Sequence, residues 1–234
     1  MLYNLSKEFK IVDLGLLYKD NLIISDLQIG LEDSLVKQGI HIPKFQYEEV
    51  MNRLKNIFSQ VKIRRTIING DLKHEFGLIS DLEWRQCSNI IDFLSKYGQV
   101  ILVKGNHDIF LGPIANKKKV LLVDEFRIDD ILILHGHKIP KNIENISTIV
   151  IGHDHPAVVL RKGLRQEKYK CFLKGKWKGK ELIVLPSFNF LNEGTDVLEL
   201  NFLSPLLQKD VNSFAVYVIE DKIYRFDSIK NINR

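Results

Sequence analysis

Apolar positions along the chain follow two different spacings, and each spacing predicts a type of secondary structure. A helical spacing over residues 46–61 predicts an amphipathic helix, with apolar positions at Val50, Leu54, Ile57, Phe58 and Val61. Ser80 followed by Glu83 forms a capping box that begins a second helix, and Gly98 marks its end. Its predicted buried stripe is Trp84, Cys87, Ile91 and Leu94.

Other apolar runs are short, rich in β-branched residues and bounded by turn residues, which predicts strands. These runs cover residues 10–14, 22–25, 66–70, 99–103, 120–123, 131–134, 148–151, 157–161, 169–173, 182–185, 213–219 and 222–226. We expect a turn at residues 19–21 and a tight turn at residues 220–221. No internal repeat, low-complexity tract or flexible linker interrupts the pattern. The simplest organisation is therefore a single domain over residues 1–234.

The composition fits a soluble α/β protein. The 234 residues are 45% hydrophobic, which is enough for a sizeable core. No apolar run approaches the roughly 20 residues that cross a bilayer, and the first eight residues hold no long apolar stretch. Cys87 and Cys171 are isolated, which favours neither a disulfide framework nor a paired-cysteine zinc site. We expect a cytoplasmic protein without membrane attachment.

Positive charge is concentrated in one segment. The net charge is +5, and residues 161–180 contain nine Lys and Arg residues and one Glu. Together with Tyr169, Phe172 and Trp177, this basic segment could follow a nucleic-acid backbone by charge and base stacking. The favoured alternative is a hairpin over residues 174–180 whose solvated lysines protect a sheet edge.

Six of the seven histidines lie in polar clusters that directly follow apolar, strand-like runs. The clusters contain Asp26 and Gln28; Asp71 and His74; Asn106, His107 and Asp108; His135 and His137; and His153, Asp154 and His155. Loops that leave the carboxyl ends of strands converge on one crevice in α/β sheets. Imidazole, carboxylate and amide groups in five such loops predict one metal site. We expect the seventh histidine, His41, to be a structural or surface residue.

These clusters resemble, in order, the motifs of the calcineurin-like metallophosphoesterase superfamily. The matching segments are Asp26-Leu27-Gln28, Gly70-Asp71, Gly105-Asn106-His107-Asp108, His135-Gly136-His137 and Gly152-His153-Asp154-His155. The ordered five-part pattern, over about residues 22–156, makes the resemblance specific. It implies an α/β fold, a four-layer sandwich of two facing mixed β-sheets flanked by helices.

A closer resemblance is to archaeal phosphoesterases related to double-strand-break repair nucleases, and to bacterial DNA-ligase-associated phosphoesterases. It rests on His74, three residues after Asp71, on the position of His135, and on the segment Leu185-Pro186-Ser187-Phe188-Asn189. The resemblance does not extend to the DNA-capping domain of the repair nucleases, so double-strand-break processing is not implied.

The resemblance implies two divalent metal ions, with Mn²⁺ expected first and iron or zinc as alternatives. One ion would be held by Asp26, residue 28, Asp71 and His155, and the other by Asp71, Asn106, His135 and His153. A hydroxide shared by two such ions would attack phosphorus. His107 would be the catalytic imidazole, kept protonated by Asp108, and His74 would contact phosphate.

Gln28 departs from the family pattern, which has His at this position. A glutamine supplies a neutral carbonyl oxygen, which is a weaker ligand for a transition metal ion. This predicts that the first ion binds less tightly than the second. The alternative is that Gln28 points elsewhere and water completes the coordination.

Three neighbours of these motifs are given other roles. We interpret His137 as packing beside His135 without binding metal, although contact with substrate remains an alternative. Lys73 and Glu75 flank Asp71, and we expect both to be solvated because charged side chains are mostly exposed.

The sequence thus predicts a metal-dependent phosphoesterase that hydrolyses a phosphodiester or phosphomonoester bond, with nucleic acid as one substrate class. One alternative is a small-molecule or nucleotide phosphatase or phosphodiesterase, whose binding would depend weakly on salt. Another is a low-activity metal-binding adaptor of a repair complex, which Gln28 suggests and His107 argues against.

Overall fold

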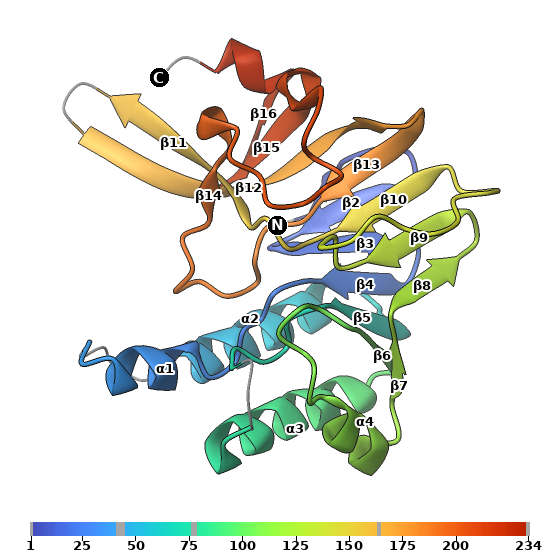
Figure 1. Cartoon of the computed structure of the whole chain (residues 1–234), viewed down its shortest axis with the longest axis vertical. Helices are drawn as coiled ribbons and strands as arrows, with labels where there is room; N and C mark the ends of the chain where they lie inside the picture. The colour runs from blue at the N-terminus through green and yellow to red at the C-terminus, as the bar shows by residue number, and fades with distance from the viewer. Residues whose placement is uncertain (1, 41–44, 76–78, 163–164, 233–234) are drawn as a thin grey trace.

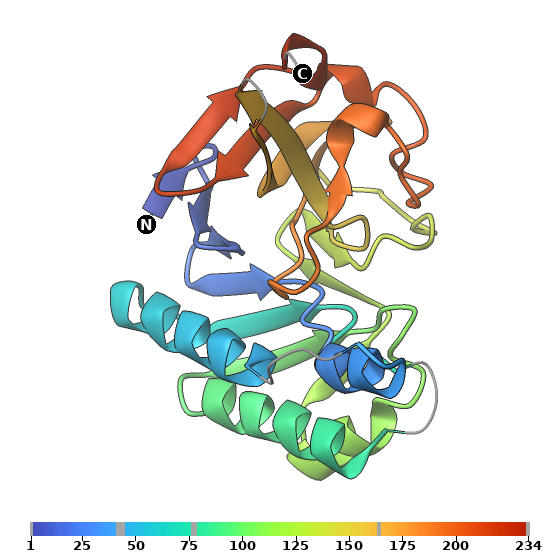
Figure 2. The same cartoon turned by 90° about the vertical axis from the view of Figure 1, so that its left-hand side faces the viewer.

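Two β-sheets pack face to face at the centre of the molecule (Figures 1 and 2). The computed structural model describes residues 2–40, 45–75, 79–162 and 165–232, so His41 lies outside the described residues. Among the described residues, no helix is both long and apolar enough to span a membrane.

The first sheet has seven strands in the order β1-β2-β3-β4-β5-β6-β7. Its strands are β1 (Leu2–Asn4), β2 (Phe9–Val12), β3 (Gly15–Tyr18), β4 (Asn21–Ile24), β5 (Arg65–Asn69), β6 (Gln99–Val103) and β7 (Leu121–Val123). Strands β1 to β4 are antiparallel neighbours, whereas β4 to β7 run parallel. The carboxyl ends of β4, β5 and β6 therefore lie side by side.

The second sheet has nine strands, with the main order β14-β11-β12-β13-β10-β9-β8 and with β15 between β12 and β16. Its strands are β8 (Glu125–Ile128), β9 (Ile131–Leu134), β10 (Thr148–Ile151), β11 (Pro156–Lys162), β12 (Arg165–Trp177), β13 (Lys180–Val184), β14 (Thr195–Asp196), β15 (Ala215–Ile219) and β16 (Ile223–Phe226). Strands β9, β10 and β13 are parallel, so their carboxyl ends also share one edge.

The outer faces of the two sheets are covered differently. In the described part of the chain, the α-helices all lie on the side of the first sheet: α1 (Leu31–Lys37), α2 (Gln46–Gln60), α3 (Asp81–Ser95) and α4 (Gly112–Lys118). The outer face of the second sheet packs against the irregular C-terminal segment with its short 3-10 turns, Val197–Glu199, Val211–Ser213 and Ile229–Asn231. The predicted α/β fold with two facing mixed sheets is confirmed. Among the described residues the α-helices flank the first sheet, and the C-terminal segment takes the place of the second helical layer.

Alternating side chains of the central strands fill two cores. Ile67 and Ile101 point between the sheets, whereas the next residues, Ile68 and Leu102, pack under the helices. This two-residue period is the geometry of a strand, and a strand buried on both faces reads as a continuous apolar run. The continuous apolar runs in the sequence therefore correspond to central strands whose two faces are both covered.

Both predicted helices are present, as α2 and α3. Ser80 caps α3, because its hydroxyl accepts a hydrogen bond from the backbone N–H of Glu83 at 3.1 Å. The carboxylate of Glu83 does not complete the predicted capping box. It accepts hydrogen bonds from the backbone N–H groups of His74 and Glu75, at 3.0 and 3.3 Å. This contact joins the start of α3 to the loop that follows β5.

The basic segment 161–180 is mostly the long strand β12. The predicted hairpin connects β12 to β13, with Trp177 paired with Lys180. Lys174 is paired on both sides, with β13 and β15, so it does not lie at a sheet edge. Lys176 pairs with β13 alone and is exposed, so edge protection stays a prediction for this part of the hairpin. Strand β12 is longer than predicted because its first half pairs with β11 and its second half with β13 and β15.

Phe172 tests the core between the sheets, because its side chain is fully buried there. We expect Phe172→Ala to lower the free energy of unfolding by about 3–5 kcal/mol, since a large cavity replaces the ring. Leu2→Ala on the half-exposed edge strand β1 is the control and should change it by less than about 0.5 kcal/mol. Urea denaturation followed by circular dichroism measures both, and equal effects would contradict this description of the core.

Candidate metal centre

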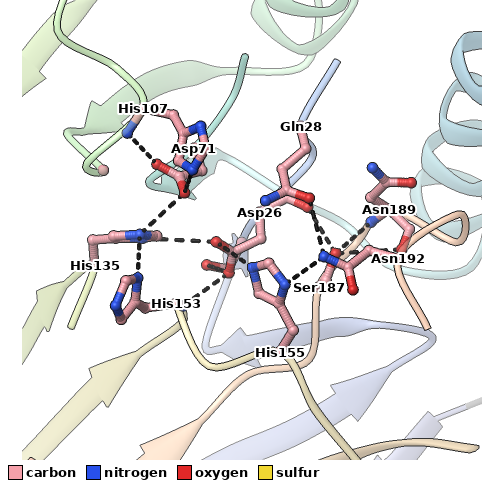
Figure 3. A network of polar contacts seen from close by, with 12 residues as sticks. Asp26, Gln28, Asp71, His107, His135, His153, His155, Ser187, Asn189 and Asn192 are labelled. Carbon is pink, nitrogen blue, oxygen red and sulfur yellow. Dashed lines mark hydrogen bonds and ion pairs between the residues drawn. The ribbon is translucent and has the colours of Figure 1, made fainter. Parts of the chain in front are cut away.

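The predicted polar clusters meet at the seam between the two sheets (Figure 3). Asp26, Asp71 and His107 follow β4, β5 and β6 of the first sheet. His135 and the pair His153 and His155 follow β9 and β10 of the second sheet. The clusters therefore converge as predicted, but from the edges of two facing sheets and not from one open sheet.

The loops place these side chains by unusual backbone conformations. Five predicted site residues have positive φ: Asp26 at 56°, Gln28 at 46°, Asp71 at 49°, His153 at 72° and His155 at 48°. The left-handed region costs a non-glycine residue of the order of 1–3 kcal/mol, and such strain concentrates at functional sites. The strain is held by backbone hydrogen bonds between loops, including Asp26 N to Gly70 O at 3.1 Å.

Glycines of the sequence motifs leave room for the polar groups. A Cβ atom at Gly105 would overlap the carboxylate of Asp71, and one at Gly70 would overlap the ring of His135. A Cβ atom at Gly152 would overlap Asp26 and the neighbouring Ser25 hydroxyl. The glycines are therefore needed for the close approach of the loops, whatever occupies the site.

Three predicted ligands of the second ion lie close to the fourth, His135. The Nε2 atom of His135 lies 3.1 Å from Asn106 Oδ1 and 3.2 Å from His153 Nδ1. The same atom lies 3.4 Å from Asp71 Oδ2. Ligand atoms about 2.0–2.2 Å from one cation are separated from each other by roughly 3.0–3.5 Å. The three distances from His135 Nε2 are of this size.

The first position is less complete. Asp26 Oδ1 lies 3.0 Å from His155 Nε2, and both atoms are buried. Ligand atoms of Asp26, Asp71 and His135 all lie within 4.8 Å of one another, which places the two positions side by side. These donors also fit a divalent cation.

Gln28 is directed away from this pair. Its side-chain Oε1 accepts a hydrogen bond from Asn192 Nδ2 at 3.2 Å, and its backbone carbonyl accepts one from Gln46 Nε2 at 2.8 Å. Figure 3 shows the Gln28 amide beside Asn192, while the carboxylate of Asp26 faces the imidazoles. This arrangement favours the alternative in which Gln28 points elsewhere.

The electrostatics of the cluster match a site built for positive charge. Burial lowers the pKa of His135, but the carboxylates of Asp26 and Asp71 overcome it and raise that pKa to about 9. Burial and the charge of His135 lower the pKa of His153 to about 4. Burial raises the pKa of Asp26, yet His155 and His135 bring it well below its usual range. Protonated His135 thus supplies the positive charge beside the carboxylates, and a bound cation would supply it instead.

Two residues that the sequence analysis missed orient the ligands. Ser25 Oγ donates to Asp26 Oδ2 at 2.6 Å, which leaves Asp26 Oδ1 facing the cluster. The carbonyl of Asn69 lies 3.1 Å from His135 Nδ1, so Nδ1–H donates to it and Nε2 faces the other ligands. Both residues adjoin a motif, but neither residue type indicates from sequence that it orients a ligand side chain.

His107 lies beside Asp71, and the Nδ1 side of its ring contacts a backbone carbonyl. Its backbone N–H donates to Asp71 Oδ1 at 3.0 Å, and its Nδ1 contacts the carbonyl of His74 at 2.6 Å. Its Nε2 lies 3.8 Å from Asp71 Oδ2. The carbonyl of His74 therefore orients the ring.

Asp108 supports the loop that carries His107. Its Oδ2 accepts a hydrogen bond from the backbone N–H of Gly105 at 3.0 Å. Burial and the charge of Asp71 raise the pKa of Asp108 to about 6. The predicted role of Asp108 in keeping the His107 imidazole protonated stays a prediction.

The remaining predicted neighbours surround the cluster. The rings of His74 and His107 stack with centroids 5.7 Å apart, and burial together with His107 lowers the pKa of His74. The ring of His137 lies 5.4 Å from that of His135, as predicted for packing beside it. Lys73 is fully buried and its Nζ donates to the carbonyl of Glu75, so its predicted solvation was wrong.

A cavity of about 660 Å³ opens beside the second position. Asn106, His135 and His137 are among the residues that line it. The lining also includes the basic residues Lys104, Lys138 and Lys141, the apolar residues Ile109 and Ile139, and the acidic residues Asp124 and Glu125. The metal centre therefore borders a space that can hold a molecule larger than phosphate.

Comparisons with known proteins agree with this fold. In structure the chain is similar to the nuclease MPE from Pseudomonas putida, with a TM-score of 0.69 and 18% identity over 93% of this chain and 94% of that chain. A Vps29 variant from Entamoeba histolytica gives a TM-score of 0.35 and 18% identity over 88% of this chain and 98% of that chain. A comparison with curated proteins gave no match.

The family model of the calcineurin-like phosphoesterases matches residues 22–185, which is well over half of the chain. The matched residues contain every motif whose side chains meet at the seam. The chain therefore belongs to the calcineurin-like phosphoesterases, metal-dependent hydrolases that act on phosphoester bonds.

Proposed function

We propose that the protein hydrolyses phosphodiester bonds in nucleic acid and that it uses two divalent cations, with manganese as the native metal. The observation that carries this proposal is the approach of donor atoms of Asp71, Asn106 and His153 to His135 Nε2, at 3.4, 3.1 and 3.2 Å, beside the cavity that Asn106 and His135 line. Imidazole, amide and carboxylate donors without thiolate suit manganese, iron or zinc.

Each predicted ligand has a defined part in this proposal. Asp71 lies between the two positions, where its two carboxylate oxygens can serve both. Asp26 and His155 would hold the first cation, and Asn106, His135 and His153 the second. When bound, two such cations lower the pKa of water and neutralise the charge that develops on phosphoryl oxygens.

His107 would handle a proton at the leaving oxygen. Its Nδ1–H donates to the carbonyl of His74, so Nε2, which lies 3.8 Å from Asp71 Oδ2, is the ring atom that can carry a second proton. A protonated Nε2 can donate to the departing oxygen and neutralise its charge. His74 stacks on this ring and would contact the phosphate from the other side.

The cavity supports nucleic acid as the substrate class. Lys104, Lys138 and Lys141 line it and can contact flanking phosphates, while Ile109 and Ile139 are 69% and 52% exposed and offer apolar surface to bases. The structural neighbour from Pseudomonas putida is called a nuclease, which agrees with this choice.

The basic segment 161–180 is a weaker candidate for this contact. Several of its charges already have partners: Arg165 with Glu167, Lys168 with Glu193 and Lys174 with Glu181. Lys170 points inward, where its ammonium donates to three backbone carbonyls. We therefore transfer the proposed nucleic-acid contact to the cavity.

His107→Asn tests the catalytic proposal. We expect hydrolysis of bis-p-nitrophenyl phosphate and of single-stranded DNA with Mn²⁺ to fall by about 10²- to 10⁴-fold, because a proton donor is lost. Mn²⁺ binding measured by calorimetry should stay unchanged, since His107 is not among the proposed ligands. Turnover that is absent in the wild type, or equal in both proteins, would favour the adaptor function.

Gln28→His tests the first metal position. An imidazole at residue 28 restores the donor type of the family, and we expect the weaker of two Mn²⁺ affinities to rise by at least about tenfold. Isothermal titration of chelator-treated protein measures both sites. Identical two-site affinities in wild type and variant would show that residue 28 has no part in binding metal.

Replacing Lys104, Lys138 and Lys141 together by Ser tests the substrate class. Each lysine that contacts a phosphate contributes about one unit to the slope of log affinity against log salt concentration. We expect weaker binding of single-stranded DNA and a smaller slope. Lys176, Lys178 and Lys180 replaced by Ser form the matched control from the basic segment. A larger effect from the control would indicate that residues 161–180 make the nucleic-acid contact. Salt-insensitive binding in the wild type would favour a nucleotide substrate.

A further inference from the structure

The loop that follows β13 contacts the backbone beside both proposed ligands of the first cation. Ser187 Oγ donates to the carbonyl of Asp26 at 2.9 Å, and Thr195 N donates to the carbonyl of His155 at 2.9 Å. Phe188 N donates to the carbonyl of Ser25 at 2.8 Å. Residues 187–195, which we call the post-β13 loop, therefore join two ligand loops that are far apart in sequence.

Asn192 in this loop contacts the side chains of the first position directly. Its Nδ2 lies 2.7 Å from His155 Nδ1 and 3.2 Å from Gln28 Oε1. Its Oδ1 accepts a hydrogen bond from Gly194 N at 3.0 Å, which fixes the amide. Because His155 Nε2 faces Asp26, Asn192 holds the opposite side of the same ring (Figure 3).

Lys170 on β12 binds the backbone of the post-β13 loop. Its Nζ donates to the carbonyls of Ser187, Asn189 and Asn192, at 2.9, 2.7 and 2.7 Å. An ammonium group has three donors, so these bonds use all of them. Burial lowers the pKa of Lys170 to about 7, although the nearby charge of Asp26 raises it. The three carbonyls favour the charged form and so offset the cost of burying it.

We propose that Asn192 is a positioning residue for the first metal position, that it fixes the imidazole of His155 and the side chain of Gln28, and that Lys170 fixes Asn192. This inference rests on the dimetal site of the proposed function. The partner of a metal-binding imidazole sets the orientation of the ring and the nitrogen that carries the proton. An amide offers a donor at Nδ2 and an acceptor at Oδ1, so a cation at His155 Nε2 would require the Asn192 amide to turn and present Oδ1 to the Nδ1–H of the ring.

The arrangement compensates for the weak donor at residue 28. A neutral glutamine that is also bonded to Asn192 contributes little to holding a cation. Affinity at the first position then depends on Asp26, Asp71 and His155, and so on how firmly His155 is oriented. Loss of Asn192 should therefore affect the first position far more than the second.

Mn²⁺ titration of the chelator-treated full chain tests the inference by calorimetry and by electron paramagnetic resonance, which distinguishes singly from doubly loaded protein. We expect Asn192→Ala to weaken one of two Mn²⁺ affinities by about 10- to 100-fold, the usual effect of removing the partner of a ligand. Asn192→Asp should restore that affinity, because a carboxylate accepts the Nδ1–H of an imidazole whose Nε2 faces a cation.

Lys170→Met should reproduce the effect of Asn192→Ala, and Lys174→Met is its matched control. Lys174 lies four residues farther along β12 and pairs with Glu181 at 2.9 Å, away from the loop. If Lys170→Met fails to fold by circular dichroism, the two Asn192 variants decide the matter.

The outcomes separate this inference from the proposed function. Wild-type protein that binds two Mn²⁺ ions, together with an Asn192→Ala variant that binds both equally well, would overturn the positioning role and leave the metal centre intact. Wild-type protein that binds no Mn²⁺ would overturn the metal centre and the inference with it. In metal-free protein, long-range ¹H–¹⁵N spectra should also show a shift of the His155 Nδ1 resonance in Asn192→Ala but not in Lys174→Met, and an unshifted resonance would contradict the contact.

Discussion

The buried carboxylates of Asp26 and Asp71 require positive charge nearby, and the rest of the site depends on this requirement. Both side chains are almost fully buried, and an ionised carboxylate there is costly unless cations or hydrogen-bond donors surround it. Without a metal ion, the requirement is met by His135, whose pKa is raised to about 9 although burial alone would lower it. Imidazoles and glycine-containing loops surround the two carboxylates. A pair of divalent cations would need the same arrangement of carboxylates and imidazoles.

The two-sheet architecture explains how distant segments meet this requirement. Parallel strands bring their carboxyl ends to one edge, and here two such edges, one from each sheet, face each other across the seam. Asp26 and Asp71 come from one sheet, whereas His135 and His155 come from the other. The charge attraction across the seam therefore couples site formation to sheet packing, and the core around Phe172 helps to hold the ligands in place.

Periodicity and motif order predicted the central strands, both long helices and the convergence of the polar clusters. The failures have physical causes. Strand β3 (Gly15–Tyr18) and helix α1 (Leu31–Lys37) are too short to show a clear period. Lys73 is buried because its ammonium donates to the carbonyl of Glu75, and hydrophobic periodicity does not reveal such a side-chain to backbone contact. Asn69 and Asn192 act through side-chain or backbone contacts with residues far away in sequence, so no spacing rule could find them.

The departure at Gln28 is best understood together with its surroundings. A glutamine in place of an imidazole removes a donor from the first position, yet the residues that orient the remaining donors are in place. Ser25 and the N–H of His153 both bind Asp26 Oδ2, and this leaves Oδ1 directed at His155. Asp26 Oδ1 and His155 Nε2 lie 3.0 Å apart, so the carboxylate and the imidazole remain directed at each other. In the proposed site, the affinity of the first position would therefore be set by the orientation of these groups more than by the number of donors.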